Sequence, residues 1–399
     1  MGNELYFDNS ATTRISEEAL KTYLSVSREQ YGNPSSLHGM GRDAEKVLSD
    51  AQKTIAKTVG ADITNLYYGE QHIPTLIFTS GGTEANNLAL FGRAHAKPRF
   101  KGKTILTTAG EHASVKMPLA ALEKEGYRIV EIPTAGGRLD PDALAQYATP
   151  DVILASVMLV NNETGALYDV PAVAAALRRN CPDAILHVDA TQAYLKVPFS
   201  VKSLGCGLLT LSSHKIEGPK GTGALWVDPG VIRNRGLSPL LLGGGQEGGL
   251  RSGTEDPASC AAFAKAAAVG FSALSERIAR LNELRDRLLS RLASDPRLSS
   301  LSVNLPPVFA PHIVSVTLPK IKSETMLHAL SARGVFVSSG SACSSHGKHG
   351  TSALSAFGLS DADADATIRI SFSHRNTVEQ VDLLCDALAE EVSRLARFK

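Results

Sequence analysis

A lysine follows a short apolar segment together with hydroxyl and imidazole side chains. Residues 208–211 are Leu-Leu-Thr-Leu, and Ser212, His214 and Lys215 come directly after them, before a Gly/Pro turn. A lysine at the end of a buried strand is poorly placed for solvation. Burial lowers the pKa of an amine, and the neutral amine can form a Schiff base with an aldehyde. Lys215 is therefore a candidate for covalent attachment of a cofactor.

A second apolar segment ends in a loop suited to a phosphate. Residues 76–79 are followed by Ser80, Gly81, Gly82 and Thr83, and then by a helical pattern over 84–94. The glycines let the backbone approach a ligand, and the first turn of a helix offers free N–H groups to an anion. The same residues also fit an ordinary helix capped by Thr83. A nucleotide-binding P-loop pattern occurs nowhere in the chain.

Three further apolar segments end in polar residues. His112 follows 104–107, Asn162 follows 152–160, and Asp189 with Gln192 follows 185–188. Each of these alone is also typical of a structural histidine or a polar turn. In a parallel sheet, however, the carboxyl ends of the strands share one edge, where ligands bind. A phosphate loop, an acid for a pyridinium nitrogen, amides for a ring hydroxyl and a Schiff-base lysine together indicate pyridoxal phosphate (PLP).

Several segments resemble the cysteine desulfurases, the NifS/IscS-like branch of the class V aminotransferase-like enzymes of PLP fold type I. The similar segments run through almost the whole chain: 6–13, 32–35, 80–84, 111–112, 160–163, 187–192, 213–215, 251–254, 338–343 and 368–371. The resemblance implies an α/β fold, with a large domain built on a mostly parallel seven-stranded sheet and a smaller α+β domain.

The resemblance also assigns roles to individual residues. Lys215 would hold PLP, His112 would stack on its ring, and Cys343 would accept the sulfur. Arg369, with Asn33 close by, would bind the substrate carboxylate. The remaining cofactor contacts would come from Gly82, Thr83, Asn162, Asp189, Gln192, Ser212, His214 and, across a homodimer, Thr254 of the second subunit.

The implied reaction is the PLP-dependent removal of sulfur from L-cysteine. It gives L-alanine and a protein-bound persulfide that passes to a sulfur-acceptor protein in iron–sulfur cluster assembly or thiolation. Cys343 lies in the Ser- and Gly-rich stretch 338–352, which is typical of a mobile loop able to carry a reactive thiolate. The other four cysteines are interpreted as structural. His346 and His349 are interpreted as solvated, and no metal site is expected.

The chain differs from its relatives in a few places. Glu217 stands where relatives often have an aromatic residue, Gln246 where some have histidine, and residues 66–75 form a longer connection. Two other functions remain open. A selenocysteine lyase shares the fold but typically has a shorter cysteine-bearing segment. A non-catalytic sulfur-relay protein would be expected to lack Lys215 or Cys343, and both are present.

The elements that must position these residues divide the chain into three parts. Residues 1–14 are expected to pack with the small domain, residues 15–255 to form the large PLP-binding domain, and residues 256–399 to form the small domain that carries the Cys343 loop. Apolar runs without alternation, separated by helices, predict a mostly parallel sheet covered on both faces. Strands are expected at 76–79, 104–107, 128–132, 152–160, 185–188, 208–211, 312–317, 335–338 and 367–372, and helical stretches at 84–94, 171–179, 257–293, 324–332 and 378–395.

The composition excludes several classes of protein. Hydrophobic residues make up 43% of the 399 residues and the formal net charge is +1, so no basic field points to direct nucleic-acid binding or to a membrane surface. No apolar run is long enough to span a bilayer, and the first residues do not resemble a signal peptide. Five cysteines, an odd number, fit a reducing compartment. We therefore expect a cytoplasmic enzyme.

Overall fold

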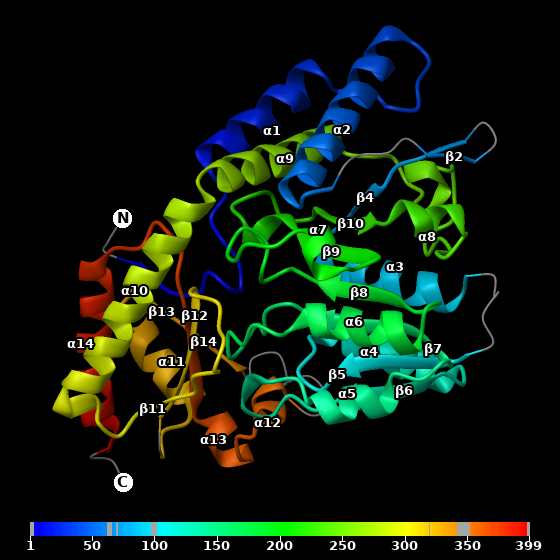
Figure 1. The fold of residues 1–399 in the computed structure, drawn as a ribbon. Coiled ribbons are helices and arrows are strands. Elements are labelled where there is room, and N and C mark those ends of the chain that lie inside the picture. The colour runs from blue at the N-terminus through cyan, green and yellow to red at the C-terminus, as the bar shows by residue number, and fades with distance from the viewer. Residues whose placement is uncertain are drawn as a thin grey trace.

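The computed structural model describes residues 4–61, 66–68, 71–96, 102–318, 320–340 and 352–396. Two layered units lie side by side, the larger on the right and the smaller on the left of Figure 1, where both chain termini also lie. The larger unit is built on a seven-stranded sheet in the order β4-β10-β9-β8-β7-β5-β6. Its strands are β4 Leu76–Thr79, β5 Thr104–Thr108, β6 Arg128–Ile132, β7 Val152–Met158, β8 Ile185–Asp189, β9 Leu208–Ser212 and β10 Gly223–Val227.

The sheet is parallel except for β10, which runs antiparallel to both of its neighbours, β4 and β9. This confirms the predicted fold class. Every residue of β4, β5, β7, β9 and β10 is buried, as expected for strands covered on both faces by helices. The helices of this unit are α1 Glu17–Glu29, α2 Gly39–Thr58, α3 Gly82–Ala94, α4 Ala113–Lys124, α5 Pro141–Tyr147, α6 Val170–Asn180, α7 Val201–Leu204, α8 Pro229–Arg233 and α9 Pro257–Ser272.

The smaller unit places helices against a second sheet, in the order β11-β12-β15-β14. Its long helices α10 and α14 lie next to each other on the outer side (Figure 1). The elements of this unit are β11 Ser302–Val303, β12 Ile313–Thr317, β13 Val335–Phe336, β14 Ser338–Ser339, β15 Thr367–Ser371, α10 Leu274–Ser294, α11 Ser323–Ser331, α12 Ala353–Phe357, α13 Asp361–Asp365 and α14 Val378–Ala396. Two short strands, β2 Leu66–Tyr68 and β3 Gln71–Ile73, pair separately within the expected long connection.

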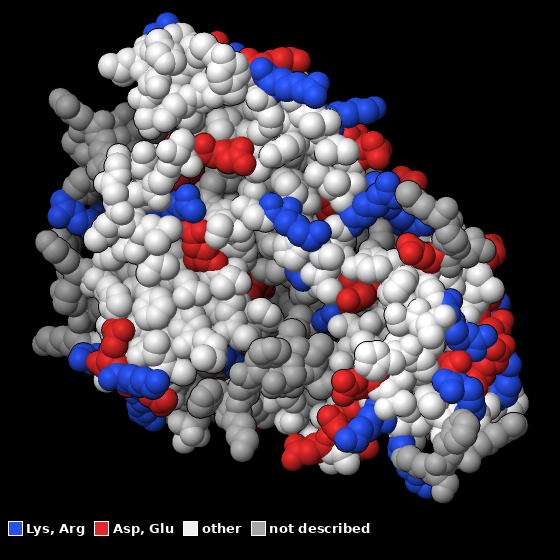
Figure 2. Space-filling model, turned by 180° about the vertical axis from the view of Figure 1, so that it is seen from behind, with Lys and Arg blue, Asp and Glu red and all other residues white. Residues whose placement is uncertain are grey.

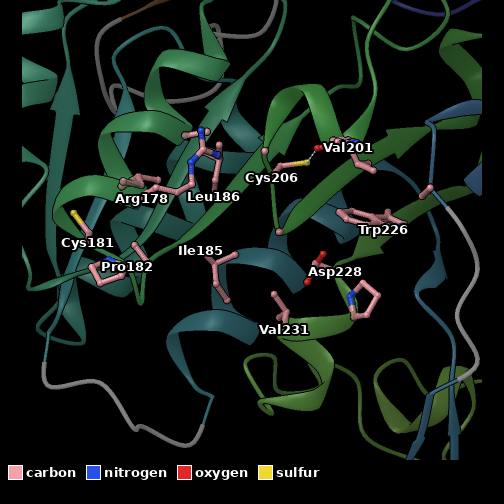
Figure 3. A pocket seen from close by; sticks show the side chains of 18 of the residues that line it. Arg178, Cys181, Pro182, Ile185, Leu186, Val201, Cys206, Trp226, Asp228 and Val231 are labelled. Carbon is pink, nitrogen blue, oxygen red and sulfur yellow. Dashed lines mark hydrogen bonds between the residues drawn. The ribbon is translucent and has the colours of Figure 1, made fainter.

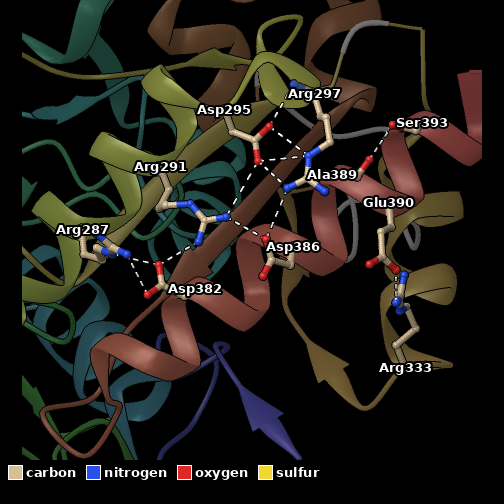
Figure 4. Close-up of polar contacts among 10 residues, drawn as sticks. All are labelled: Arg287, Arg291, Asp295, Arg297, Arg333, Asp382, Asp386, Ala389, Glu390 and Ser393. Carbon is tan, nitrogen blue, oxygen red and sulfur yellow. Dashed lines mark hydrogen bonds and ion pairs between the residues drawn. The ribbon is translucent and has the colours of Figure 1, made fainter.

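A network of ion pairs joins α10 to α14 (Figure 4). Arg287 donates two hydrogen bonds of 2.8 Å to the two carboxylate oxygens of Asp382. Arg291 bridges the same aspartate to Asp386, at 2.8 and 2.7 Å. A single exposed pair contributes little to stability, but a network with a bidentate arginine holds its helices in a fixed relation. The network therefore fixes α10 against α14 within the smaller unit.

The first residues of the chain belong to the smaller unit. The strand β1 Leu5–Tyr6 pairs with β13, and Phe7 packs edge-on against Phe372 with ring centroids 5.9 Å apart. Leu5 and Phe7 are both buried in the core of that unit. Residues 8–16 then cross to the larger unit, where Thr13 accepts and donates hydrogen bonds in the turn around Lys215.

The expected helical stretch 257–293 is in fact two helices, α9 and α10, bent by 74°. The helix α9 packs against α1 and α2 at the top of Figure 1, whereas α10 packs against α14. Phe263 of α9 meets Tyr194 edge-on in the core of the larger unit, at 6.4 Å. A single straight helix could not pack into both cores, so the chain passes from the first core to the second at this bend. The helix α9 therefore belongs to the core of the larger unit, although it follows the expected boundary at residue 256.

Other elements also differ from the sequence expectation. β10 was not expected, and residues 335–338 form not one strand but the separate strands β13 and β14, which pair with β1 and β15. Among the described residues, no single helix has the length and apolar character needed to cross a bilayer; only the bent pair α9 and α10 reaches that threshold together.

Candidate functional site

The carboxyl ends of the parallel strands open onto a cavity of about 250 Å³. Polar residues from β8, β9 and the starts of α3 and α4 face it, which is the expected position for a ligand in such a sheet. Its lining includes the residues proposed from sequence for the cofactor: Gly82, Thr83, His112, Asn162, Asp189, Gln192, Ser212, His214 and Lys215.

Lys215 lies in the short 3₁₀ turn Ser213–Lys215 that follows β9. Its ammonium group donates hydrogen bonds to the carbonyl oxygens of Ser10, at 2.5 Å, and Ala11, at 2.7 Å. Burial, followed by the nearby charges of Arg369 and Lys196, lowers the pKa of Lys215 to about 8. The amine therefore loses its proton far more readily than a surface lysine, as Schiff-base formation requires.

Asp189 ends β8 as a buried carboxylate held in a fixed orientation. Its Oδ1 accepts the backbone N–H of Thr191 at 2.9 Å, and its Oδ2 accepts the side-chain amide of Asn86 at 2.8 Å. Asn86 also donates to the hydroxyl of Ser114, at 2.8 Å. A carboxylate fixed in this way fits a partner with positive charge, such as a pyridinium nitrogen.

The start of α3 has room and hydrogen-bonding capacity for a phosphate. A Cβ atom added to Gly82 would lie 3.0 Å from Thr191 Oγ1, so only glycine keeps this corner open without displacing its neighbours. The hydroxyls of Thr191 and Ser212 are buried, and neither has a hydrogen-bond partner. Two orphaned hydroxyls beside the positive end of a thirteen-residue helix match the needs of a phosphate group, and the residues present therefore fit PLP.

His112 caps the start of α4 and is held in one tautomer. Its Nδ1 accepts the backbone N–H of Ser114 at 3.1 Å. Burial lowers the pKa of His112, so the ring is neutral near neutral pH. Since Nδ1 is an acceptor, the proton of the neutral ring lies on Nε2. The ring of His112 also lines the cavity, where a neutral imidazole can stack on an aromatic cofactor and donate one hydrogen bond.

Arg369 reaches the site from β15 of the smaller unit. It donates to the carbonyl oxygen of Asn162 at 2.8 Å and to Asp8 Oδ1 at 2.9 Å, while its Nε is buried without a partner. β14 pairs beside it, with Ser338 opposite Arg369. A Cβ atom on Gly340 would lie 2.6 Å from Glu163 Oε2, so the chain passes close to Glu163, the neighbour of Asn162 in the sequence, before the segment that contains Cys343.

Several predicted residues do not line this cavity. Asn33 is exposed in the connection between α1 and α2, where its side chain accepts the N–H of Ser35 at 2.9 Å. Thr254 is exposed just before α9. Cys343, His346 and His349 lie outside the described residues.

The structure adds residues that sequence reasoning did not single out. The carbonyl oxygens of Ser10 and Ala11 hold the amine of Lys215, and the amide of Asn86 holds Asp189. Glu111 is fully buried beside His112 and accepts the N–H of Met158 at 2.8 Å; burial raises its pKa to about 8. The only signal for Asn86 was its place in the first turns of the helical pattern that follows the phosphate loop, and carbonyl oxygens leave no signal in the sequence.

A larger hollow of about 600 Å³ lies at the opposite end of the sheet (Figure 3). Its lining includes Trp226 and the thiols of Cys181 and Cys206. Burial raises the pKa of Cys206 to about 12 and raises that of Cys181 as well, so both remain protonated at neutral pH. The acid and the lysine that line this hollow, Asp228 and Lys202, are half-buried and exposed, respectively. The smaller cavity, which combines the buried carboxylate of Asp189 with Lys215, is therefore the candidate active site.

Comparison with known proteins agrees with this geometry. The family described as Aminotransferase class-V matches residues 5–384. A NifS/IcsS protein homolog of Lactobacillus delbrueckii subsp. bulgaricus is 38% identical over 388 residues, 97% of this chain and 96% of that protein. Cysteine desulfurase IscS 1 of Archaeoglobus fulgidus is 36% identical over 394 residues, covering 98% and 97%.

Solved structures give the same result. A NifS-like protein superposes with a TM-score of 0.87 at 32% identity, covering 98% of this chain and 99% of that chain. SspA in complex with cysteine superposes with a TM-score of 0.76 at 28% identity, covering 93% and 99%. With the match extending over nearly the whole length, the chain belongs to the class V aminotransferase family and, within it, to the PLP-dependent NifS/IscS-like cysteine desulfurases.

Proposed function

We propose that this protein is a cysteine desulfurase that takes sulfur from L-cysteine, releases L-alanine and carries the sulfur as a persulfide on Cys343. The observation that carries the proposal is the cavity lined by Lys215, Asp189 and two orphaned hydroxyls. Arg369 of the other unit lies beside this cavity, on the carbonyl oxygen of Asn162. Bound PLP supplies an electron-withdrawing ring that stabilises negative charge at the substrate Cα.

Side chains of the protein carry out substrate binding, proton transfer and attack on the sulfur. The guanidinium of Arg369, oriented by Asn162 and Asp8, binds the substrate carboxylate through paired N–H donors. The amine of Lys215, with its lowered pKa, moves the proton at Cα. The Cys343 thiolate attacks the substrate sulfur: an S–S bond forms, the C–S bond breaks, and its electron pair returns to carbon, which takes a proton to complete alanine.

The persulfide would then pass to an acceptor protein of iron–sulfur cluster assembly or thiolation. A cytoplasmic location fits this chemistry, because thiols stay reduced there. The four cysteines among the described residues are free and buried, which agrees with such a compartment.

A homodimer would complete the site. Thr254 lies outside the cavity of its own chain, and apolar side chains are unusually exposed, with Leu37 at 93%, Leu242 at 83% and Tyr31 at 70%. On the face that Figure 2 shows, charged side chains are sparser over the larger unit, on the left, than over the smaller unit, on the right. Exposed apolar surface of this kind marks an interaction site.

We expect light scattering to show two chains per particle. Leu242→Asp should shift the protein toward monomers and weaken PLP retention, because an aspartate cannot be buried in an apolar interface without a partner. Leu383→Asp is the matched control, since Leu383 is 50% exposed on α14 of the smaller unit. A wild-type monomer with full activity would rule out the dimer.

Arg369→Lys should raise KM for cysteine by roughly tenfold or more, because a lysine cannot replace a bidentate guanidinium. PLP content should stay the same, since Arg369 does not line the cofactor cavity. Steady-state kinetics and the absorbance of bound PLP measure the two effects. Arg128→Lys, at an exposed position, is the control. An unchanged KM would show that another residue binds the substrate carboxylate.

The choice between cysteine and selenocysteine is tested by measuring alanine released from each. A cysteine desulfurase releases alanine and sulfide from L-cysteine in the presence of a reductant. Release of alanine from selenocysteine alone would favour the selenocysteine lyase, and release from neither would favour a non-catalytic relay protein.

A further inference from the structure

Glu217 follows the cofactor lysine by two residues and has an unusual backbone conformation. Its φ angle is +68°, in the left-handed region that glutamate rarely adopts. Its N–H donates to Thr13 Oγ1 at 2.8 Å, and its carbonyl oxygen accepts the N–H of Ser16 at 2.9 Å. Such a conformation persists only where the surroundings fix it. The turn after Lys215 is therefore tied to residues 13–16.

The carboxylate of Glu217 points from the larger unit into a group of basic side chains of the smaller unit. Only 6% of its side chain is exposed. Arg375 Nε donates to Oε1 at 2.8 Å, Arg277 of α10 lies 3.5 Å from Oε2, and His374 Nδ1 lies 3.8 Å from Oε1. One buried carboxylate thus contacts three side chains of the other unit.

These contacts connect the two halves of the active site. On one side, Glu217 is two residues from Lys215; on the other, Arg375 follows Arg369 by six residues, just beyond the end of β15. A void of about 20 Å³ between the two sides is lined by Lys215 as well as by Glu217 and His374. The junction therefore lies between the turn that carries Lys215 and the end of the strand that carries Arg369.

Loss of the negative charge at Glu217 would disturb the junction. Burial lowers the pKa of His374 to about 4, so its ring is neutral near neutral pH, and it adds no positive charge there. Arg277 and Arg375 remain charged, and without Glu217 they would face each other with no acid between them. Arg277, whose side chain is only 14% exposed, would then be a largely buried charge without its acid, which is costly, and the two units can relieve that cost by shifting apart.

We infer that Glu217 is a positioning residue: it clamps the Lys215 turn to the end of the strand that carries Arg369, and so fixes the position of the guanidinium that binds the substrate carboxylate. The inference rests on the proposed function.

The test compares Glu217→Gln, which keeps the shape of the side chain and removes its charge, with the wild type. The KM for L-cysteine should rise roughly tenfold or more, because misplacement of a binding group by about 1 Å can cost up to about a hundredfold. The kcat should fall less, and the PLP content should not change. A binding measurement independent of turnover uses the product: the Kd of L-alanine, followed by the absorbance of bound PLP, should rise by a similar factor.

Two further variants make the test specific. Arg375→Gln removes the other half of the clamp and should also raise the Kd of L-alanine. In the double variant the Kd should be only slightly higher than in the weaker-binding single variant, because the two residues act through one contact. Glu391→Gln is the matched control. Glu391 has a side chain 8% exposed and pairs with Arg333 and Arg394 inside the smaller unit, so its loss should lower the unfolding temperature without changing the Kd.

A Glu217→Gln protein with wild-type KM and wild-type Kd for L-alanine would overturn the clamp, as would an equal rise of Kd in Glu391→Gln. Failure of the proposed function has a different signature. The wild type would then bind L-alanine, and the Kd of L-alanine would still rise in the Glu217→Gln variant, but the wild type would release no alanine from cysteine.

Discussion

Lys215→Ala protein is expected to purify without covalently attached PLP and to lose cysteine desulfurization by about a thousandfold or more, because both attachment and proton transfer use this amine. Among the described residues, Lys215 is the lysine that lines the cofactor cavity, and its pKa of about 8 suits both roles. In the wild type, borohydride reduction should fix PLP to the peptide that contains Lys215, which mass spectrometry can identify.

Lys196→Ala is the control for this result. Burial lowers the pKa of Lys196 to about 8 as well, but its side chain lines the small void next to Glu217 rather than the cofactor cavity. That variant should keep a reducible cofactor linkage. A Lys215→Ala protein that still formed such a linkage would show that another lysine holds PLP.

Cys343→Ser is expected to bind PLP and cysteine normally and to lose turnover by about a thousandfold or more, because a serine hydroxyl is far less acidic and nucleophilic than a thiol. The other cysteines are poor substitutes. All four are buried, and burial raises the pKa of Cys206 and Cys385 to about 12. They therefore remain protonated at neutral pH.

The measurement combines the absorbance change on adding cysteine with retention of labelled sulfur on the protein. Cys343→Ser should show the first and not the second. Cys206→Ser, which changes a buried thiol by one atom, should show both. If Cys343→Ser protein kept its rate and its labelled sulfur, the role of sulfur acceptor would belong to a different cysteine.

The sequence predicted the positions of the site residues best where a continuous apolar run ends in polar groups. Asp189, Lys215 and Gly82 all follow such runs, and the geometry of a parallel sheet brings the ends of those runs together. The bend between α9 and α10 was missed although it has a signal. α9 is apolar on most of its surface and is buried, whereas α10 buries only one stripe, so the two cannot share one environment.

The contacts that orient the site could not be predicted, because their partners lie far apart in the chain. Asn86 and Asp189 meet across the sheet, and Ser10 binds Lys215 through a carbonyl oxygen, a group that every residue carries. Glu217 was visible only as a difference from relatives. Its burial against Arg375 depends on how the two units pack, and no local pattern encodes that.

A single turnover of the PLP-loaded protein with L-cysteine and no reductant shows whether Cys343 takes the sulfur from the substrate. Alanine and protein-bound sulfur should form in equal amounts, about one of each per active site, with the sulfur recovered as a persulfide on the peptide that contains Cys343. Free sulfide without alanine, or alanine with no sulfur left on the protein, would show that Cys343 does not accept sulfur from L-cysteine.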